Sequence, residues 1–321
     1  MPPMIAKPPD DVGLVYDDLF LAHQAPPGHP EHAGRLVAAM AGLRESGLGD
    51  GLRCLPRASL TREDAERVHH PMYLNRLERE VAGRTDYLDL DTFHSPRSLD
   101  AAKAAAGGCV ALTRAVAEGD LRAGLALVRP PGHHAEANTS GGFCLLNNVA
   151  LAAAAARTMG LRPAIFDFDV HHGNGTQWIF YEDPDVLVIS IHRLGPGFYP
   201  GSGAATERGQ GRGEGTNLNL PLSRGSGIQQ YLELTDGPAS RAVDDFSPDI
   251  LLVSAGFDAH RDDPMGGMEL TDEDFGQLIQ RAAAWARRHC RGRWVAVLEG
   301  GYDPGALKQG TVSLATCLLS G

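Results

Sequence analysis

Six short apolar runs that alternate with helical patterns constrain the fold of this chain more than any other feature. The stretches between them include 101–118 and 148–159, which are rich in the strong helix former alanine. A third stretch, 270–288, begins with Thr271-Asp272-Glu273-Asp274, which resembles the capping box of a helix start. Strands that alternate with helices predict βαβ units, and so an α/β fold with a central, mostly parallel β-sheet flanked by helices. The runs predicted to be central strands are 13–16, 125–128, 164–168, 186–191, 250–254 and 294–298.

The length and the pattern of the chain favour one domain over 1–321. A chain of 321 residues can bury one large core, and it contains no linker-like tract, internal repeat or low-complexity segment. The longest apolar stretch, 144–156, is interrupted by two asparagines and is too short to cross a bilayer. Met1-Pro2-Pro3-Met4 lacks the charged and apolar regions of a signal peptide. We therefore expect a protein that does not enter a membrane.

Charge and cysteine usage limit the class of protein further. The chain has 40 acidic against 29 basic side chains, and its net charge of −11 disfavours a nucleic-acid-binding surface and would suit a cationic substrate. The five cysteines are scattered, odd in number and without a CxxC pair. This usage indicates the reducing cytoplasm and argues against a zinc ion held by cysteines.

The segment 167–175, with the sequence DFDVHHGNG, is the densest polar cluster. It follows the apolar run 163–166 directly and ends in a Gly-Asn-Gly turn signal. Because successive side chains of an extended chain alternate, we expect Asp167, Asp169 and His171 on one side. Carboxylates and an imidazole at the mouth of a buried strand have the geometry of a metal site, and such groups would be costly to bury unpaired. The alternative is a hydrogen-bonded Asp-His cluster at a strand end.

Polar side chains also follow three further predicted strands. In open parallel sheets, sites form outside the carboxyl ends of the strands. A single aspartate at such an end is more often a turn former, but four polar strand ends together predict an active site along this edge. The three further segments are RPPGHHA (129–135), AGFD (255–258) and EGGY (299–302).

The residue types at these ends predict a hydrolytic site with one metal ion. Asp169, His171 and Asp258 would supply three ligands and leave open positions for water and substrate, as catalytic zinc requires. Two carboxylates neutralise the charge of the metal, so its water should be less acidified than at an all-histidine site. A nearby general base is then needed, and His133 or His134 fits that need. The structural alternative for the two histidines is a solvent-exposed turn after Pro-Pro-Gly.

Two other side chains suit the same chemistry. Asp167 is placed to orient an imidazole through its second ring nitrogen. Tyr302, between a Gly-Gly pair and Asp303, could donate a hydrogen bond to a developing oxyanion.

The motifs, in their order along the chain, resemble those of the histone deacetylase-type zinc hydrolases, which have the arginase/deacetylase fold. The resemblance covers about 15–302 and is strongest to class II enzymes and to the bacterial deacetylase-like and acetylpolyamine amidohydrolases. Asn174 and the segment His29-Pro30-Glu31 look like class II rather than class I. The motifs are RPPGHHA (129–135), GGFCLLNN (141–148), DFDVHHGNGTQ (167–177), FYPGSG (198–203), SAGFDAH (254–260), DPMGG (263–267) and LEGGYD (298–303).

The resemblance implies a role for each matching residue. Zinc would bind to the three ligands named above. His134 would be the general base for the attacking water, and His133 an electrostatic or acid partner that is hydrogen-bonded to Asp167. Asn174 matches the position that supports His134, where some relatives have Asp. Tyr302 would polarise the amide carbonyl, and relatives with His at its position deacetylate acetyl-lysine poorly, so the tyrosine favours real activity.

The resemblance also implies a tunnel for the acyl-amine stem. Phe143 and Tyr199 match its two aromatic walls, and Gly142 matches its floor. Met265 matches a rim position at which a polyamine-selective relative carries Glu. Tyr199 adds a hydroxyl near the mouth, where many relatives have Phe, whereas Phe198 is expected to pack inward.

Arg35 matches an arginine of an internal cavity through which acetate is released.

The family also binds monovalent cations structurally. The matching positions for an inner potassium ion are Asp167, Asp169, His171, Ser190 and Ile191, and those for an outer ion are Phe180, Asp183 and Val186.

We expect a zinc-dependent deacetylase of linear amides, whose substrate is an acetylated lysine peptide or an acetylated small amine. One alternative is an arginase- or agmatinase-like ureohydrolase with two manganese ions, which needs further aspartate ligands and gives Tyr302 no role. Another is a non-catalytic acyl-amine binding module, which predicts a lost ligand, base or tyrosine, and none is lost. The loops at the tunnel mouth decide the substrate, and a homo-oligomer that places a neighbour's loop there would narrow the mouth.

Overall fold

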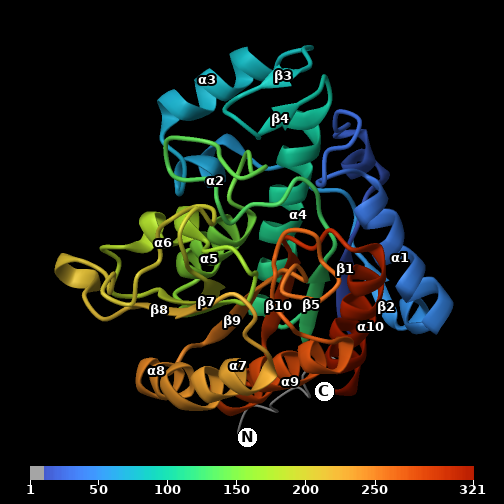
Figure 1. Ribbon diagram of the computed structural model, residues 1–321. Helices are drawn as coiled ribbons and strands as arrows, with labels where there is room; N and C mark the ends of the chain where they lie inside the picture. Colours follow the sequence, from blue (N-terminus) through green and yellow to red (C-terminus); the bar gives the residue numbers. More distant parts are fainter. Residues whose placement is uncertain (1–10) are drawn as a thin grey trace, which may run out of the picture.

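A central sheet of eight strands organises the computed structural model, which describes residues 11–321 (Figure 1). The segment Met1-Pro2-Pro3-Met4, in which no signal peptide was predicted, lies outside the described residues. Every neighbouring pair of strands in the sheet is parallel, which confirms the predicted α/β fold. In spatial order the strands are β2 (Leu52–Cys54), β1 (Val12–Val15), β5 (Ala123–Ala126), β10 (Trp294–Leu298), β9 (Ile250–Ala255), β6 (Pro163–Asp167), β7 (Leu187–Arg193) and β8 (Asn217–Leu222).

The six predicted strands occupy the six inner positions of this sheet, and the two edge strands had not been predicted. β2 exposes two of its three residues, and β8 alternates asparagines with leucines around Pro221. Strands buried on only one face lack the continuous apolar run of a central parallel strand, and proline is confined to edges. The predicted strand 125–128 needs correction. β5 ends at Ala126, although the buried apolar residues continue to Val128. A small separate hairpin pairs β3 (Asp86–Tyr87) with β4 (Phe93–His94).

Helices cover both faces of the sheet (Figure 1). α4 (Ser98–Glu118) packs on α5 (Asn148–Thr158) at one face, and α9 (Asp272–His289) packs on α10 (Pro304–Ser320) at the other. All three predicted helices are present, and α9 begins with the predicted capping box. The other helices are α1 (Gly34–Ser46), α2 (Arg62–Glu66), α3 (Pro71–Val81), α6 (Asn174–Phe180), α7 (Ile228–Leu234) and α8 (Ser240–Phe246), with short 3-10 or π segments at Asp18–Ala22, Leu48–Gly51, Gly211–Gly213 and Thr235–Ala239.

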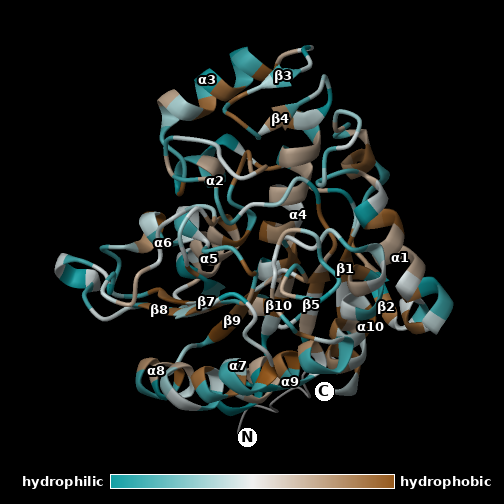
Figure 2. Ribbon diagram, in the orientation of Figure 1, coloured by the Kyte–Doolittle hydropathy of each residue, from teal (hydrophilic) through white to brown (hydrophobic). Residues whose placement is uncertain are grey.

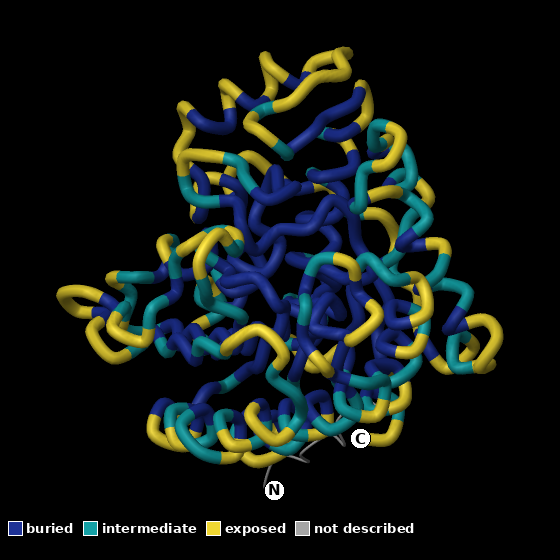
Figure 3. Tube along the Cα trace, in the orientation of Figure 1, coloured by how far each residue is buried: buried dark blue, intermediate teal, exposed yellow. Residues whose placement is uncertain are grey.

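The central strands form the apolar core. Among them β9 is coloured as hydrophobic in Figure 2, and Figure 3 shows the centre of the fold as buried. Every residue of β6, β9 and β10 is buried, as expected for strands that have helices on both faces. Among the helices described over 11–321, none combines the length and the hydropathy needed to cross a bilayer.

The strand order brings the polar strand ends together. β5, β10, β9 and β6 are consecutive neighbours in the sheet although they lie far apart in the sequence. Because they are parallel, their carboxyl ends lie along one edge, and the segments that follow them meet there. The segments are 129–135, 299–302, 256–258 and 167–174.

Candidate active site

Three buried side chains converge at the ends of β6 and β9. The ligand atoms of Asp169, His171 and Asp258 all lie within 4.8 Å of one another. His171 Nδ1 lies 3.2 Å from Asp169 Oδ1 and 3.0 Å from Asp258 Oδ2. A Cβ at Gly256 would lie 2.1 Å from Asp169 Oδ2, and one at Gly300 would lie 2.2 Å from Asp258 Oδ2, so only glycine leaves room for the cluster. The structure therefore brings together the three predicted ligands.

Backbone donors fix the orientation of this cluster. Asp169 accepts hydrogen bonds from the N–H of Gly300 at 2.7 Å and of His171 at 2.9 Å. Asp258 Oδ1 accepts a hydrogen bond from Val170 N–H at 2.8 Å. Burial, and next the repulsion from the charge of Asp169, raise the pKa of Asp258 to about 7. Two carboxylates and an imidazole are a donor set of zinc, and a cation among them would remove this repulsion, so the residues fit the metal.

The adjacent histidines 133 and 134 differ in their partners. His133 Nδ1 lies 2.9 Å from Asp167 Oδ2, and His134 Nδ1 lies 2.8 Å from Asn174 Oδ1, as predicted. Burial would lower the pKa of His133, but the carboxylates of Asp167 and Asp169 outweigh it and raise the pKa to about 10. Burial and the charges of the neighbouring imidazoles hold the pKa of His134 well below its usual range. His133 is therefore an imidazolium, and His134 a neutral imidazole.

A buried glutamate at the end of β10 holds the segment that carries these histidines. Glu299 Oε2 accepts hydrogen bonds from the N–H of Gly132 at 2.7 Å and of His133 at 3.2 Å. Burial raises the pKa of Glu299 to about 7, against the opposing charge of His133. Glu299 had no predicted role, although its place beside Gly-Gly-Tyr in a motif was a signal.

Tyr302 lies just before α10, and its backbone is tied to the loop after β9. Its N–H donates to Asp263 Oδ2 at 2.7 Å, and the next residue, Asp303, caps the helix by accepting from Ala306 N–H at 2.8 Å. The other oxygen of Asp263 accepts from Met265 N–H at 2.9 Å, so one carboxylate joins the predicted rim to the predicted oxyanion donor. Burial raises the pKa of Tyr302 well above its usual range, and its phenol therefore remains a donor.

Arg35 lies beneath this loop in a buried ionic network. It donates to Gly301 O at 2.6 Å and to Glu31 Oε1 at 3.0 Å, and its guanidinium lies 5.0 Å from the ring centre of Tyr302. Glu31 also binds the buried Arg129, which donates to Glu31 Oε2 at 2.7 Å. Arg35 thus supports the tyrosine loop, whereas its part in an acetate-release cavity stays a prediction.

The predicted tunnel residues lie around the histidines. Phe143 is buried and contacts Tyr302 edge-on with ring centres 6.1 Å apart, and its N–H donates to Thr92 Oγ1 at 3.1 Å. The ring centre of Tyr199 lies 4.9 Å from that of His134. Gly142 lies between them, since a Cβ there would meet the His134 ring at 2.3 Å.

Phe198 packs inward, as predicted. It is half-buried against the core and stacks on the His171 ring, with ring centres 4.9 Å apart and planes 8° apart. The guanidinium of Arg193 lies 4.0 Å from the centre of the same ring. Phe198 therefore supports a predicted metal ligand, which its position next to Tyr199 alone did not indicate.

The structure brings only some of the predicted potassium-binding residues close together. β6 and β7 place Asp167 directly opposite Ser190, whose Oγ lies 2.9 Å from His192 Nδ1, and Ile191 is buried beside it. At the outer positions, Asp183 N–H donates to Phe180 O at 2.9 Å, and Asp183 is paired with Arg157. Potassium at either position stays a prediction.

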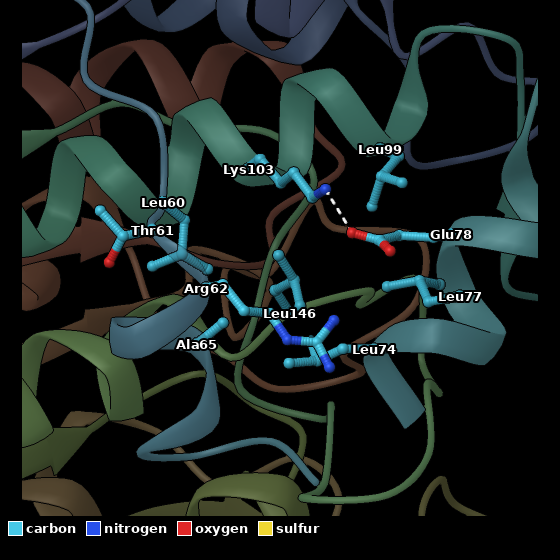
Figure 4. Close-up of a pocket in the computed structure, with 10 residues that line it drawn as sticks. All are labelled: Leu60, Thr61, Arg62, Ala65, Leu74, Leu77, Glu78, Leu99, Lys103 and Leu146. Carbon is cyan, nitrogen blue, oxygen red and sulfur yellow. Dashed lines mark hydrogen bonds and ion pairs between the residues drawn. The ribbon is translucent and has the colours of Figure 1, made fainter. Parts of the chain in front are cut away.

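A separate cavity of about 60 Å³ lies between α2, α3 and α4 (Figure 4). Half of the residues that line it are leucines, and an ion pair of 2.7 Å between Lys103 Nζ and Glu78 Oε1 crosses its edge. None of the predicted catalytic or metal-binding residues lines this cavity, so it is not part of the candidate active site.

Comparisons with known proteins extend over almost the whole chain. Residues 29–318 match the histone deacetylase domain. The chain is 40% identical to a probable deacetylase of Archaeoglobus fulgidus, and the match covers 91% of this chain and 81% of that protein. It is 38% identical to histone deacetylase 15 of Arabidopsis thaliana and 37% identical to histone deacetylase 9 of Homo sapiens. These matches cover 95% and 98% of this chain but only 56% and 34% of the longer relatives. The crystal structure of the HDA15 HD domain is similar with a TM-score of 0.92 and 36% identity, covering 97% of this chain and 90% of that one.

Proposed function

This chain belongs to the histone deacetylase family, and from that premise we propose that it is a zinc-dependent deacetylase of acetyl-lysine or a related acylated primary amine. The observation that carries the proposal is the convergence of three metal ligands with two buried histidines, one hydrogen-bonded to Asp167 and the other to Asn174. A neutral His134 beside an imidazolium His133, with a protonated Tyr302 nearby, supplies a base, a cation and a hydrogen-bond donor around three metal ligands.

Asp169, His171 and Asp258 would hold one zinc ion, which supplies Lewis acidity toward the amide carbonyl and the attacking water when bound. His134, neutral and hydrogen-bonded through Nδ1 to Asn174, takes the proton of the water at Nε2. The water oxygen bonds to the acyl carbon, and Tyr302 donates a hydrogen bond to the oxyanion that develops. His133, held as an imidazolium by Asp167, stabilises this negative charge. The C–N bond then breaks, the amine leaves with a proton from the histidine pair, and the acid is released.

The tunnel residues support a narrow, flexible substrate stem. Gly142, Phe143 and Tyr199 surround the approach to His134, and Met265 lies on the rim segment that Asp263 ties to Tyr302. An acetylated lysine peptide and an acetylated small amine both present such a stem. We propose in addition structural potassium near Asp167, Asp169, His171, Ser190 and Ile191.

The two alternative functions differ from this proposal in the number of metal ions or in the need for catalytic groups. A dimanganese ureohydrolase needs ligands that bridge two metal ions. Among the described residues, one convergent group of three potential metal ligands is found, which supports one ion. A non-catalytic binding module would not need a base and an oxyanion donor, and both are retained here.

For the chain as a whole, we propose one catalytic domain over 1–321. All five cysteines are free thiols, which supports a reducing compartment such as the cytoplasm. The chain spans only part of the length of the plant and human relatives, so the proposal includes none of the partners that bind the rest of those proteins.

The test is turnover by the purified, zinc-loaded protein on acetyl-lysine peptides, acetylputrescine and acetylspermidine. Tyr302→Phe should lower kcat by about 10² to 10³ with zinc retained, because it removes one oxyanion donor. Asp258→Ala should lose both zinc and turnover. Tyr181→Phe, a tyrosine at the C-terminal end of α6, is the matched control and should retain both.

The metal content and the substrates separate the alternatives. Turnover that is lost in both variants supports the mechanism, and the preferred substrate decides between peptide and small amine. Two manganese ions per chain would indicate the ureohydrolase. One zinc ion with binding but no turnover of any acylated amine would indicate the binding module.

A further inference from the structure

Glu136, which no motif role had covered, is hydrogen-bonded to the partner of His134. Asn174 Nδ2 donates to Glu136 Oε1 at 3.0 Å, and Asn174 Oδ1 lies 2.8 Å from His134 Nδ1. The three side chains form one chain of hydrogen bonds, Glu136 to Asn174 to His134. Glu136 and Asn174 are half-buried, and His134 is buried.

An asparagine in this position leaves the tautomer of His134 undecided. If its carbonyl oxygen faces His134, Nδ1 must carry the ring proton, and Nε2 is free to accept one. If its NH₂ group faces His134 instead, Nδ1 must accept, and the ring proton moves to Nε2, where the base can no longer act. An aspartate would not have this ambiguity, because both of its oxygens accept.

A carboxylate next to the amide removes the ambiguity. It accepts hydrogen bonds and donates none, so it binds the NH₂ group of Asn174 and repels the carbonyl oxygen. We propose that Glu136 is a positioning residue that fixes the Asn174 amide and, through it, the tautomer of His134 with Nε2 free. This inference rests on the proposed deacetylase function, in which His134 is the base.

The backbone of Glu136 is itself fixed from two sides. Its N–H donates to Thr139 O at 2.9 Å, and its carbonyl oxygen lies 3.0 Å from His69 Nδ1. Burial lowers the pKa of His69 to about 4, so the ring is neutral, and its Nε2 accepts from Asn147 N–H at 3.0 Å. Asn147 caps α5 by accepting from Ala150 N–H at 2.9 Å. Glu136 is therefore anchored to the start of a core helix.

The experiment varies residue 136 in two backgrounds, the wild type and Asn174→Asp. Glu136→Gln removes the preference for one amide orientation and should lower kcat roughly twofold. Glu136→Lys reverses the preference, because an ammonium attracts the carbonyl oxygen, and should lower kcat roughly tenfold or more at unchanged KM. In the Asn174→Asp background the carboxylate accepts in either orientation, and both changes also remove a like charge beside it, so neither should lower kcat relative to that parent. Glu182→Lys makes the same change of charge at an exposed position and should have no effect.

The tautomer itself can be read without any turnover. In ¹⁵N-histidine NMR spectra of the zinc-free protein, with His134 assigned by His134→Phe, the wild type should show a proton on Nδ1. Glu136→Lys should move it to Nε2, and zinc content and thermal unfolding should stay those of the wild type. An unchanged tautomer, or equal losses of kcat in both backgrounds, would overturn the proposal in favour of a purely structural glutamate. If the wild type turns over no acylated amine, the deacetylase proposal fails, while the spectra still decide the role of Glu136.

Discussion

The charges of His133 and His134 depend on the side chains that their Nδ1 atoms meet. Asp167 is a buried carboxylate and holds a proton on His133, whereas His134 meets the uncharged amide of Asn174, and burial and the neighbouring imidazole charges hold its pKa well below its usual range. Two identical residue types, adjacent in sequence and both buried, thereby acquire different chemical roles. Burial lowers the pKa of both imidazoles, and only His133 lies beside carboxylates whose charge outweighs it.

Replacement of Asp167 by Asn should make this difference measurable as a pH dependence of stability. The pKa of His133 is raised from 6.5 to about 10 in the folded chain. The stabilisation by its proton is therefore fully present below pH 6.5 and is lost as the pH rises through about 10. We expect the zinc-free wild type to exceed Asp167→Asn in free energy of unfolding by about 2–4 kcal/mol at about pH 6, and the gap to shrink toward about pH 10. Urea unfolding at a series of pH values measures it, and a gap that is constant with pH would contradict this origin.

At the scale of elements, helix starts place and stabilise active-site segments. Asp303 caps α10 directly after Tyr302, and Asn147 caps α5 beside the anchor of Glu136. α9 begins with a capping box, in which the carbonyl oxygen of Thr271 accepts from the N–H of Asp274 at 3.1 Å, and the side chain of Asp274 accepts from Thr271 N–H at 2.9 Å. The first two caps lie next to the site, whereas the α9 box serves the helix alone.

Loss of the α9 capping box should therefore affect stability but not turnover. Asp274→Ala leaves the N–H of Thr271 without its side-chain acceptor and removes a carboxylate from the first helical turn, and should lower the free energy of unfolding by about 1 kcal/mol. Thr316→Ala places an alanine at an exposed interior position of α10, where alanine is the better helix former, and should not destabilise. Chemical unfolding measures both variants. A loss of turnover in Asp274→Ala would show that α9 affects the site as well.

At the scale of the whole molecule, one buried carboxylate joins three distant segments. Glu31 lies before α1 and binds Arg35 in that helix and Arg129 after β5. Arg129 also donates to Phe20 O at 3.0 Å, and Arg35 reaches the carbonyl oxygens that follow β10. The chain between residues 20 and 35 is thus fixed across the carboxyl edge of the sheet.

Glu31→Gln should destabilise the protein strongly. It removes the negative charge that compensates two buried guanidinium groups, and the cost of such a broken buried pair is about 3–5 kcal/mol. Although burial opposes it, the charges of Arg129 and Arg35 hold the pKa of Glu31 well below its usual range, so its contribution is present at neutral pH and is lost as the pH falls below that range. Asp100→Asn breaks the exposed pair with Arg97 and should cost at most about 1 kcal/mol. Equal effects of the two variants in thermal or urea unfolding would contradict this account.

The chemistry of the site could be predicted from the sequence because metal ligands, a base and an oxyanion donor require particular residue types. Asp169, His171 and Asp258 were identified in this way, and the structure brings them together. The inner strands were predicted because a parallel strand that is covered on both faces is a continuous apolar run. The edge strands β2 and β8 could not be, because their partly exposed residues carry no such pattern.

The supporting glutamates and aspartate could be assigned only from the tertiary structure. Glu299, Glu136, Glu31 and Asp263 have the same side-chain chemistry as the solvated acids on the surface, and their roles follow from burial and from the donors that they meet. The sequence by itself determined which groups can do the chemistry and that they follow parallel strands. Only the tertiary structure decided that β5, β10, β9 and β6 are neighbours, because strand order depends on how helices pack between distant strands rather than on any local pattern.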